Sequence, residues 1–311
     1  MRRLRTPALF AVVLALALGF AASSGRPALA VGSQIRTFVA STGSDANPCS
    51  RIAPCRTFGA ALAQTASGGE IVALDSGGYG AVTISQAVSI VAAPGIQASI
   101  SPSSGAAITV SAGPSDAVVL RNLYLNAQGG QSGIEYYSAA ALHVENLVIN
   151  GFTNIGIFMD LATAADLYVA DTIIRNSGGG IYLSSGSGIA NVSIVRARVE
   201  NNGYGVYASD NARASVKDTI VSGNAQTALY ASSGASPVVL NLEGCVVSGN
   251  YYGIYASSSS STATVRVSNC SITGNNTGVF TSSNASTLSR GNNTLEGNTT
   301  NGTFSGSYAA K

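Results

Sequence analysis

The sequence predicts an all-β solenoid, in which about nine or ten coils of parallel β-structure stack on one another next to a short helical cap. Three observations predict this fold. From about residue 107, apolar residues in the same context recur in steps of 22 to 26 residues. Apolar and polar residues alternate within each period, which is typical of strands and not of helices. Turns of Gly, Ser and Asn divide each period into three short strands.

Composition excludes several classes of protein. The chain has 311 residues, of which 46% are hydrophobic and 10% charged, and its formal net charge is +2. So small a charge offers no basic surface to a phosphate backbone, and no nucleic-acid partner is predicted. High apolar content with few charges also excludes a disordered chain. With one His and four Cys, a metal site would have to rely on carboxylates.

Residues 1–30 have the features of a signal peptide. Arg2, Arg3 and Arg5 precede an apolar run over residues 8–22, and small residues at Ala28 and Ala30 form a cleavage signature. We predict cleavage after about Ala30 and a secreted or periplasmic protein without a membrane span; a retained N-terminal anchor is the alternative. Disulfides persist in such compartments, and Cys49 and Cys55 are close enough in sequence to pair.

Three sets of apolar residues, one for each strand of a coil, recur through the repeats. The first strand contributes Ile134, Ile157, Ile181, Val206, Leu229, Ile254 and Val279. The second contributes the pairs Leu142/Val144, Leu167/Val169, Val192/Ile194, Ala214/Val216, Leu240/Leu242 and Val265/Val267. The third contributes Ile149, Ile174, Val199, Val221, Val247, Ile272 and Leu295. Stacking places like residues over like, which buries the inner face that one coil cannot bury alone.

Two further columns are polar and mark the corners of the coils. Asn122, Asn146, Asp171, Asp218 and Asn269 fall between the second and third strands, and Asn202, Asn224, Asn250, Asn275 and Asn298 follow the third strand. Asn and Asp tolerate left-handed turns and bond to nearby backbone, and stacked Asn side chains bond to one another. We interpret both columns as structural.

Residues 31–70 are predicted to form an N-terminal cap, residues 71–306 the coils and residues 307–311 a tail. Thr57 is a good helix N-cap. Phe58, Ala61, Leu62 and Thr65 share one helical face, and the glycines at 68 and 69 are predicted to end the helix. Such an amphipathic helix would cover the open end of the core.

The repeated Gly-Ile-Tyr strands with Asn corners, together with the segments 37–45, 55–62 and 69–72, resemble the right-handed parallel β-helix proteins of the pectin-lyase-like superfamily. The resemblance covers roughly residues 37 to 300 and implies the fold, but the superfamily holds lyases, hydrolases, epimerases and adhesins. The catalytic strings of its polygalacturonase-like and alginate-epimerase-like members are absent here. No Lys or Arg base of the pectate-lyase kind occupies an outward position of the first strands.

An aromatic column occupies one outward position of the first strands on six successive coils. Its members are Phe158, Tyr182, Tyr207, Tyr230, Tyr255 and Phe280, with a column of Ser beside it. Aromatic faces suit the apolar faces of sugar rings, and Ser hydroxyls suit sugar hydroxyls. The resemblance implies that this sheet lines a substrate groove. We therefore predict substrate-binding residues for an extended polysaccharide; stabilisation of the sheet by stacked rings, or cover by a loop, is the alternative.

Glu135 and Asp160 are the candidate catalytic residues. They lie on adjacent coils of the same sheet, one column apart, with backbones roughly 8 Å from each other. Paired carboxylates at such separations serve as acid and base in inverting glycosidases, and with backbone carbonyls they would also suit Ca²⁺. Solvated surface acids are the simpler interpretation.

Two remaining features are not assigned chemistry. His143 points outward on the second strand without an acid–base partner. Cys245 and Cys270 occupy equivalent inward positions on adjacent coils, so either a second disulfide or two buried thiols is predicted.

The leading hypothesis is thus an exported, monomeric polysaccharide-binding protein. A polysaccharide lyase or glycosidase, and a structural or adhesive surface protein, are the alternatives.

Overall fold

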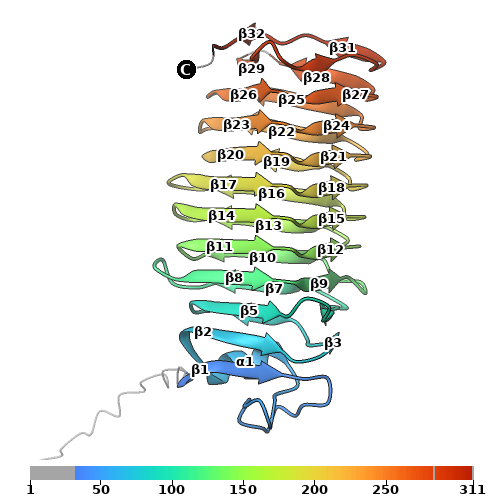
Figure 1. The fold of residues 1–311 in the computed structure, drawn as a ribbon. Helices are drawn as coiled ribbons and strands as arrows, with labels where there is room; N and C mark the ends of the chain where they lie inside the picture. Colours follow the sequence, from blue (N-terminus) through green and yellow to red (C-terminus); the bar gives the residue numbers. More distant parts are fainter. Residues whose placement is uncertain (1–31, 283, 310–311) are drawn as a thin grey trace, which may run out of the picture. The chain divides into compact units, whose positions relative to one another are not determined.

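A computed structural model of the chain describes residues 32–282 and 284–309. These residues form about nine right-handed turns of a parallel β-solenoid, which confirms the predicted fold class. The coils stack one above another, with the single helix of the described residues at the N-terminal end of the stack (Figure 1). The predicted signal peptide, residues 1–30, lies outside the described residues.

Three parallel sheets run along the stack, and each complete coil contributes one strand to each sheet. Sheet C holds the first strands: β4 (Val82–Ile84), β7 (Ala106–Ser111), β10 (Ser132–Ser138), β13 (Ile155–Leu161), β16 (Gly179–Ser185), β19 (Val206–Ala208), β22 (Thr227–Ser233), β25 (Tyr252–Ser258), β28 (Thr277–Thr281) and β31 (Thr300–Gly302).

Sheet A holds the second strands: β1 (Gln34–Val39), β2 (Thr65–Ala73), β5 (Val88–Ala92), β8 (Ala117–Arg121), β11 (Ala141–Glu145), β14 (Ala165–Ala170), β17 (Ala190–Val195), β20 (Ala212–Lys217), β23 (Val238–Glu243), β26 (Ala263–Ser268), β29 (Ala285–Ser289) and β32 (Gly306–Ser307). Sheet B holds the third strands: β3 (Gly77–Gly78), β6 (Ala98–Ile100), β9 (Leu123–Asn126), β12 (Val148–Asn150), β15 (Ile173–Arg175), β18 (Arg198–Glu200), β21 (Ile220–Ser222), β24 (Val246–Ser248), β27 (Ser271–Thr273) and β30 (Thr294–Leu295).

The core is the interior of the coil, filled by the three apolar sets. The register aligns each set residue on residue; for example, Ile181 pairs with Val206 and Val206 with Leu229. Nearly every member is buried, and Leu295, on the last strand of sheet B, is only partly buried against the core. Alternate residues therefore face solvent, and the outward columns of sheets A, B and C are the surfaces on which function is to be sought.

The corner between sheets A and B is a left-handed turn on successive coils. All five predicted residues have positive φ, from 49° at Asp218 to 60° at Asn122. Arg196 and Gly244 occupy the same corner on their coils, with φ of 51° and 65°. Arg196 was not predicted there. Its guanidinium is held by Asp171, with both nitrogen–oxygen distances at 2.7 Å.

The second Asn column forms a hydrogen-bonded ladder at the corner between sheets B and C. Each backbone N–H donates to the side-chain oxygen of the Asn one coil further on, over 2.9–3.1 Å, through Asn202, Asn224, Asn250, Asn275 and Asn298. The first four side chains are buried. The ladder satisfies polar groups that the corner would otherwise bury without partners, which supports the structural interpretation of the column.

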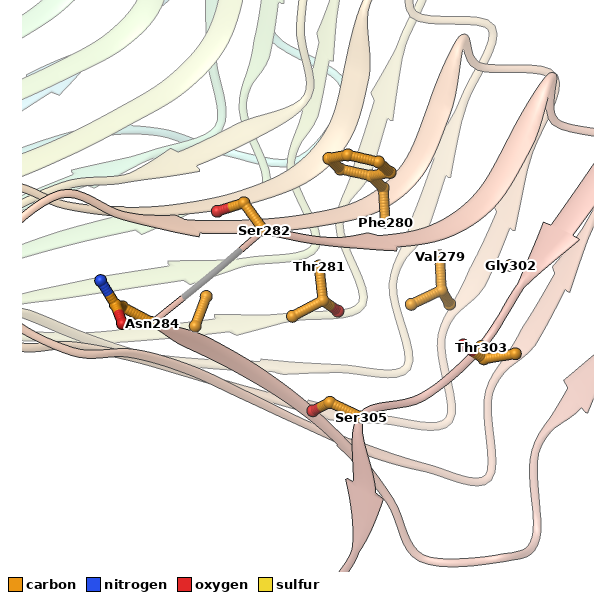
Figure 2. Close-up of a pocket in the computed structure, with 9 residues that line it drawn as sticks. Val279, Phe280, Thr281, Ser282, Asn284, Gly302, Thr303 and Ser305 are labelled. Carbon is orange, nitrogen blue, oxygen red and sulfur yellow. The ribbon is translucent and has the colours of Figure 1, made fainter.

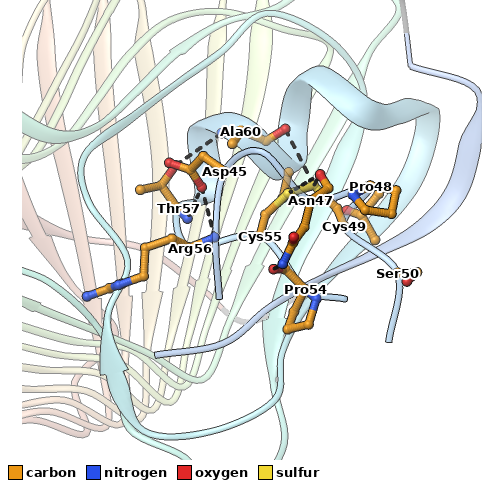
Figure 3. Close-up of a disulfide and its surroundings, with 12 residues drawn as sticks. Asp45, Asn47, Pro48, Cys49, Ser50, Pro54, Cys55, Arg56, Thr57 and Ala60 are labelled. Carbon is orange, nitrogen blue, oxygen red and sulfur yellow. Dashed lines mark hydrogen bonds between the residues drawn. A yellow bond between two sulfur atoms is a disulfide. The ribbon is translucent and has the colours of Figure 1, made fainter. Parts of the chain in front are cut away.

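Helix α1 (Phe58–Gln64) has Thr57 as its N-cap, as predicted, and the Thr57 side chain accepts from the Ala60 N–H at 3.2 Å (Figure 3). Asp45 holds the same turn by accepting from the N–H groups of Arg56 and Thr57, at 2.8 Å each. The disulfide between Cys49 and Cys55 is confirmed.

The predicted end of the helix at Gly68 and Gly69 is wrong. The helix ends at Gln64, and Thr65 already begins β2 in extended backbone. The Thr65 hydroxyl is buried against the Thr37 hydroxyl of β1 at 2.7 Å. A β-branched residue with a partner on a neighbouring strand is better placed in a sheet than in a last helical turn.

Candidate functional site

The predicted aromatic residues form one continuous row on the outer face of sheet C, which we name the aromatic strip: Phe158, Tyr182, Tyr207, Tyr230, Tyr255 and Phe280. Neighbouring ring centroids lie 5.3, 5.3, 4.6, 4.7 and 5.0 Å apart along the row. The first five rings are half-buried by one another, and Phe280, at the end, is 42% exposed. Among the described residues, no loop covers the row completely.

Outward orientation of the strip follows from strand alternation. In β28, Val279 and Phe280 project to opposite sides of the strand (Figure 2). Val279 is buried, whereas Phe280 is exposed. Both residues border a pocket of about 460 Å³, whose lining also includes Thr281, Ala285 and Ser305.

A tyrosine hydroxyl of the strip bonds to the Ser column beside it. The Tyr230 hydroxyl and the Ser257 hydroxyl, one coil further on, lie 2.9 Å apart. Burial raises the pKa of Tyr207 and of Tyr255 above the usual value for a phenol. Both phenols are therefore neutral near pH 7 and able to donate or accept hydrogen bonds at the edge of the strip.

A pocket of about 470 Å³ opens in the middle of the strip, and we name it the tyrosine pocket. Its lining consists of Tyr204, Tyr207, Gln226, Thr227, Tyr230, Tyr251, Tyr252 and Tyr255. Three of the tyrosines come from the turn and the strand start that precede the strip. The Tyr204 ring meets the strip ring of Tyr207 at 82°, and the Tyr252 ring meets that of Tyr255 at 40°. The Tyr251 ring packs against Tyr252.

The aromatic column predicted from the sequence does not include Tyr204, Tyr251 and Tyr252. The signal was present, because Tyr204 and Tyr252 stand three residues before Tyr207 and Tyr255. Three residues along a regular strand would place the side chains on opposite faces. The chain turns between Tyr204 and Val206, and in β25 (Tyr252–Ser258) the alternation breaks at Gly253 and Ile254, which are both buried. Tyr204 and Tyr252 therefore face the same pocket as Tyr207 and Tyr255.

The candidate catalytic residues lie at the N-terminal end of the strip. Glu135 is the register partner of Phe158, and Asp160 is the register partner of Ser184, so the carboxylates lie on adjacent coils one column apart. The Tyr137 hydroxyl donates to Glu135 Oε2 at 3.2 Å. The pKa of Tyr137 is raised by partial burial and by the negative charges of Glu135 and Asp160.

Basic side chains are absent from the whole of sheet C as the structure describes it. None of its ten strands contains Lys or Arg, whereas Glu135 and Asp160 carry negative charge there. Within residues 32–282 and 284–309, no group of three or more His, Cys, Asp or Glu side chains is placed to hold a metal ion. No helix in that part of the chain is long and apolar enough to cross a membrane.

Other singled-out residues lie away from the strip. His143 is on sheet A, stacked on Tyr168 with ring centroids 4.6 Å apart. Cys245 and Cys270 are buried free thiols, which decides between the two predicted states. The Cys245 N–H donates to the Cys270 sulfur at 3.4 Å. The hydrogen bond to Cys270 and burial raise the pKa of the Cys245 thiol.

Comparison with known proteins agrees with this architecture. The family described as "Right handed beta helix region" matches residues 73–215 and 132–300. The crystal structure of pectate lyase Pel9A is similar with a TM-score of 0.50 and 14% sequence identity, over 91% of this chain and 80% of that chain. A likeness at this identity concerns the fold alone. No curated protein matches the sequence. Since one family match spans more than half of the chain, the protein belongs to the right-handed β-helix family.

Proposed function

We propose that this protein binds an extended polysaccharide along the aromatic strip. The observation that carries the proposal is the row of six outward rings on consecutive coils, with centroid spacings of 4.6–5.3 Å. Such a row offers a long chain repeated apolar faces, while tyrosine and serine hydroxyls along its edge offer hydrogen bonds to sugar hydroxyls. The similarity in fold to a pectate lyase supports a polysaccharide as the class of ligand.

Affinity electrophoresis in gels containing single polysaccharides tests the proposal. The test variant is Tyr207→Ser/Tyr230→Ser, which removes two adjacent rings from the middle of the strip. The matched control is Tyr168→Ser, which removes a 40% exposed ring from sheet A. We expect the wild type and the control to be retarded by the same glycan and the strip variant to run freely.

The competing interpretation, that the rings only stabilise the sheet, gives a different result. The strip variant would then melt at a lower temperature and keep its full retardation. That result would refute binding along the strip, and circular dichroism shows whether each variant is folded.

A second candidate function is cleavage of the bound polymer at Glu135 and Asp160. The supporting observation is their position at one end of the strip, with Tyr137 bonded to Glu135. One carboxyl group would act as acid and the other as base. Two carboxylates supply few of the six to eight oxygen ligands that Ca²⁺ takes, so a calcium site there would need oxygens from backbone, water or sugar. Product formation with and without a chelator tests this candidate.

Export is the remaining part of the proposal. It is supported by the signal-like segment in residues 1–30 and by the disulfide between Cys49 and Cys55. Expression of the full chain in a secreting host, followed by N-terminal sequencing of the exported protein, tests it. We expect the mature chain to begin close to Val31.

A further inference from the structure

We propose that the tyrosine pocket binds one electrically neutral sugar unit and thereby makes the strip selective for a neutral polysaccharide over an acidic one. This inference rests on the proposed function and adds the chemical class of the ligand.

The pocket exists because a threonine separates two tyrosines that occupy equivalent positions on the coils before and after it. Thr227 is the register partner of Tyr252 on the next coil. Tyr204 is its equivalent on the preceding coil, because Tyr204 and Thr227 each stand two residues before a member of the register pair Val206 and Leu229. Thr227 therefore lies between Tyr204 on the preceding coil and Tyr252 on the next. The two wall residues are two coil steps apart, about 9–10 Å along the stack, and a threonine cannot fill the space between their rings.

A glycine keeps one wall of the pocket away from its centre. Gly179 lies on the coil before Tyr204, and a Cβ atom there would stand 2.3 Å from Cζ of the Tyr204 ring. The ring thus leans over Gly179, on the side away from Thr227. The resulting volume of about 470 Å³ lies within the range of small-ligand pockets, about 300–1,000 Å³.

The residues that line the pocket suit a neutral ligand. Its eight residues are six tyrosines, one glutamine and one threonine, and none carries a charge. Burial raises the pKa of Tyr204, so its hydroxyl also stays neutral. Ring faces suit the apolar face of a pyranose, and the Gln226 amide and the Thr227 hydroxyl can donate to and accept from its hydroxyls.

An acidic sugar would fit poorly. A uronate carboxylate entering the pocket would lose water without gaining a cationic partner, because sheet C has no Lys or Arg on its described strands. The nearest fixed charges on the same sheet are carboxylates, Glu135 and Asp160, which repel a polyanion lying along the strip.

The test compares ligands that differ in charge and variants that differ in one coil. Binding of an oligogalacturonate, its fully methyl-esterified form, and neutral xylo-, manno- and cello-oligosaccharides of the same length is measured by calorimetry. Thr227→Tyr fills the pocket and leaves every strip residue in place. Thr277→Tyr is the matched control, because Thr277 is the register partner of Tyr252 on the next coil and does not line the pocket.

We expect the wild type to bind a neutral oligosaccharide most tightly, with an affinity that changes little between about 0.1 M and 1 M NaCl. Thr227→Tyr should lower that affinity about tenfold, as the loss of one set of ring contacts predicts, and Thr277→Tyr should not. Should Thr227→Tyr fail to fold, Tyr204→Ser and Tyr252→Ser remove the walls one at a time and should each weaken neutral binding.

Failure of this inference is distinguishable from failure of the proposed function. If the carboxylate form binds most tightly, or if filling the pocket leaves neutral binding unchanged while Tyr207→Ser/Tyr230→Ser abolishes it, the strip binds glycan and the neutral pocket is wrong. If Tyr207→Ser/Tyr230→Ser binds every glycan as the wild type does, both proposals fall.

Discussion

Removing one side chain from the asparagine ladder at the corner between sheets B and C should lower the free energy of unfolding far more in the middle of the ladder than at its end. Asn250 is buried, and its Oδ1 accepts from the backbone N–H and from Nδ2 of Asn224 at 2.9 and 3.0 Å. Its Nδ2 donates to the Val221 carbonyl at 3.2 Å and to Asn275 Oδ1 at 2.9 Å. Asn250→Ala leaves both Asn224 donors without that acceptor.

The magnitude follows from those two donors. Each buried donor left without a partner costs about 1–3 kcal/mol, so Asn250→Ala should lower the free energy of unfolding by about 2–6 kcal/mol. Asn298 receives the same pair of bonds from Asn275 at 2.9 Å, but its side chain is only half-buried. Water can replace it there, and Asn298→Ala should cost only about 0.5–1.5 kcal/mol.

Urea unfolding followed by far-ultraviolet circular dichroism measures both values. Native-state hydrogen exchange adds a local readout, since the Asn224 amide should lose protection in Asn250→Ala before amides in distant coils do. An Asn250→Ala protein within about 0.5 kcal/mol of the wild type, with the Asn224 amide still protected, would refute the reasoning that the ladder satisfies this corner.

Three further predictions concern charge, thiols and catalysis. Burial alone raises the pKa of Asp75, but hydrogen bonds from Tyr79 and a nearby serine lower it overall; its stabilising effect is thus present above about pH 4 and lost as the pH falls through the folded pKa. In Asp75→Asn, the melting temperature should therefore depend less on pH below about pH 4 than it does in the wild type. An unchanged pH dependence in that range would count against this assignment. Cys245 and Cys270 should resist a thiol reagent in the folded protein and react as two thiols once it is unfolded without reductant; finding none would mean that they are oxidised. On any polymer that the wild type cleaves, Glu135→Gln should reduce the rate by about 100-fold or more without changing retardation in affinity gels, and an unchanged rate would dismiss Glu135.

Much of the fold could be predicted because equivalent residues recur at the same position of each coil of a solenoid. Identical roles recur once per coil, so Ile181, Val206 and Leu229 identify one another as a column, and the aromatic strip follows from the same register. The helix end could not be found in this way, since the cap does not repeat. There the pairing of Thr65 with Thr37 across two strands outweighed the glycines that follow.

The tyrosines that complete the tyrosine pocket could not be predicted from strand alternation. Strict alternation misplaces Tyr204, which belongs to the turn before β19, and Tyr252, which precedes two consecutive buried residues in β25. The state of the two thiols was equally hidden, because stacked positions alone allow either a bond or a close contact. Only three-dimensional coordinates distinguish them.

The interruption at Thr227 has a consequence for protein engineering. Thr227 lines the pocket, whereas Leu229, two residues further on, belongs to the apolar core. A threonine placed between two tyrosines on another run of coils, with a glycine one coil before the first tyrosine, would transplant the recess to a new position without repacking any apolar residue. Recognition elements in this scaffold could then be spaced by whole coils to match the repeat of a chosen polymer.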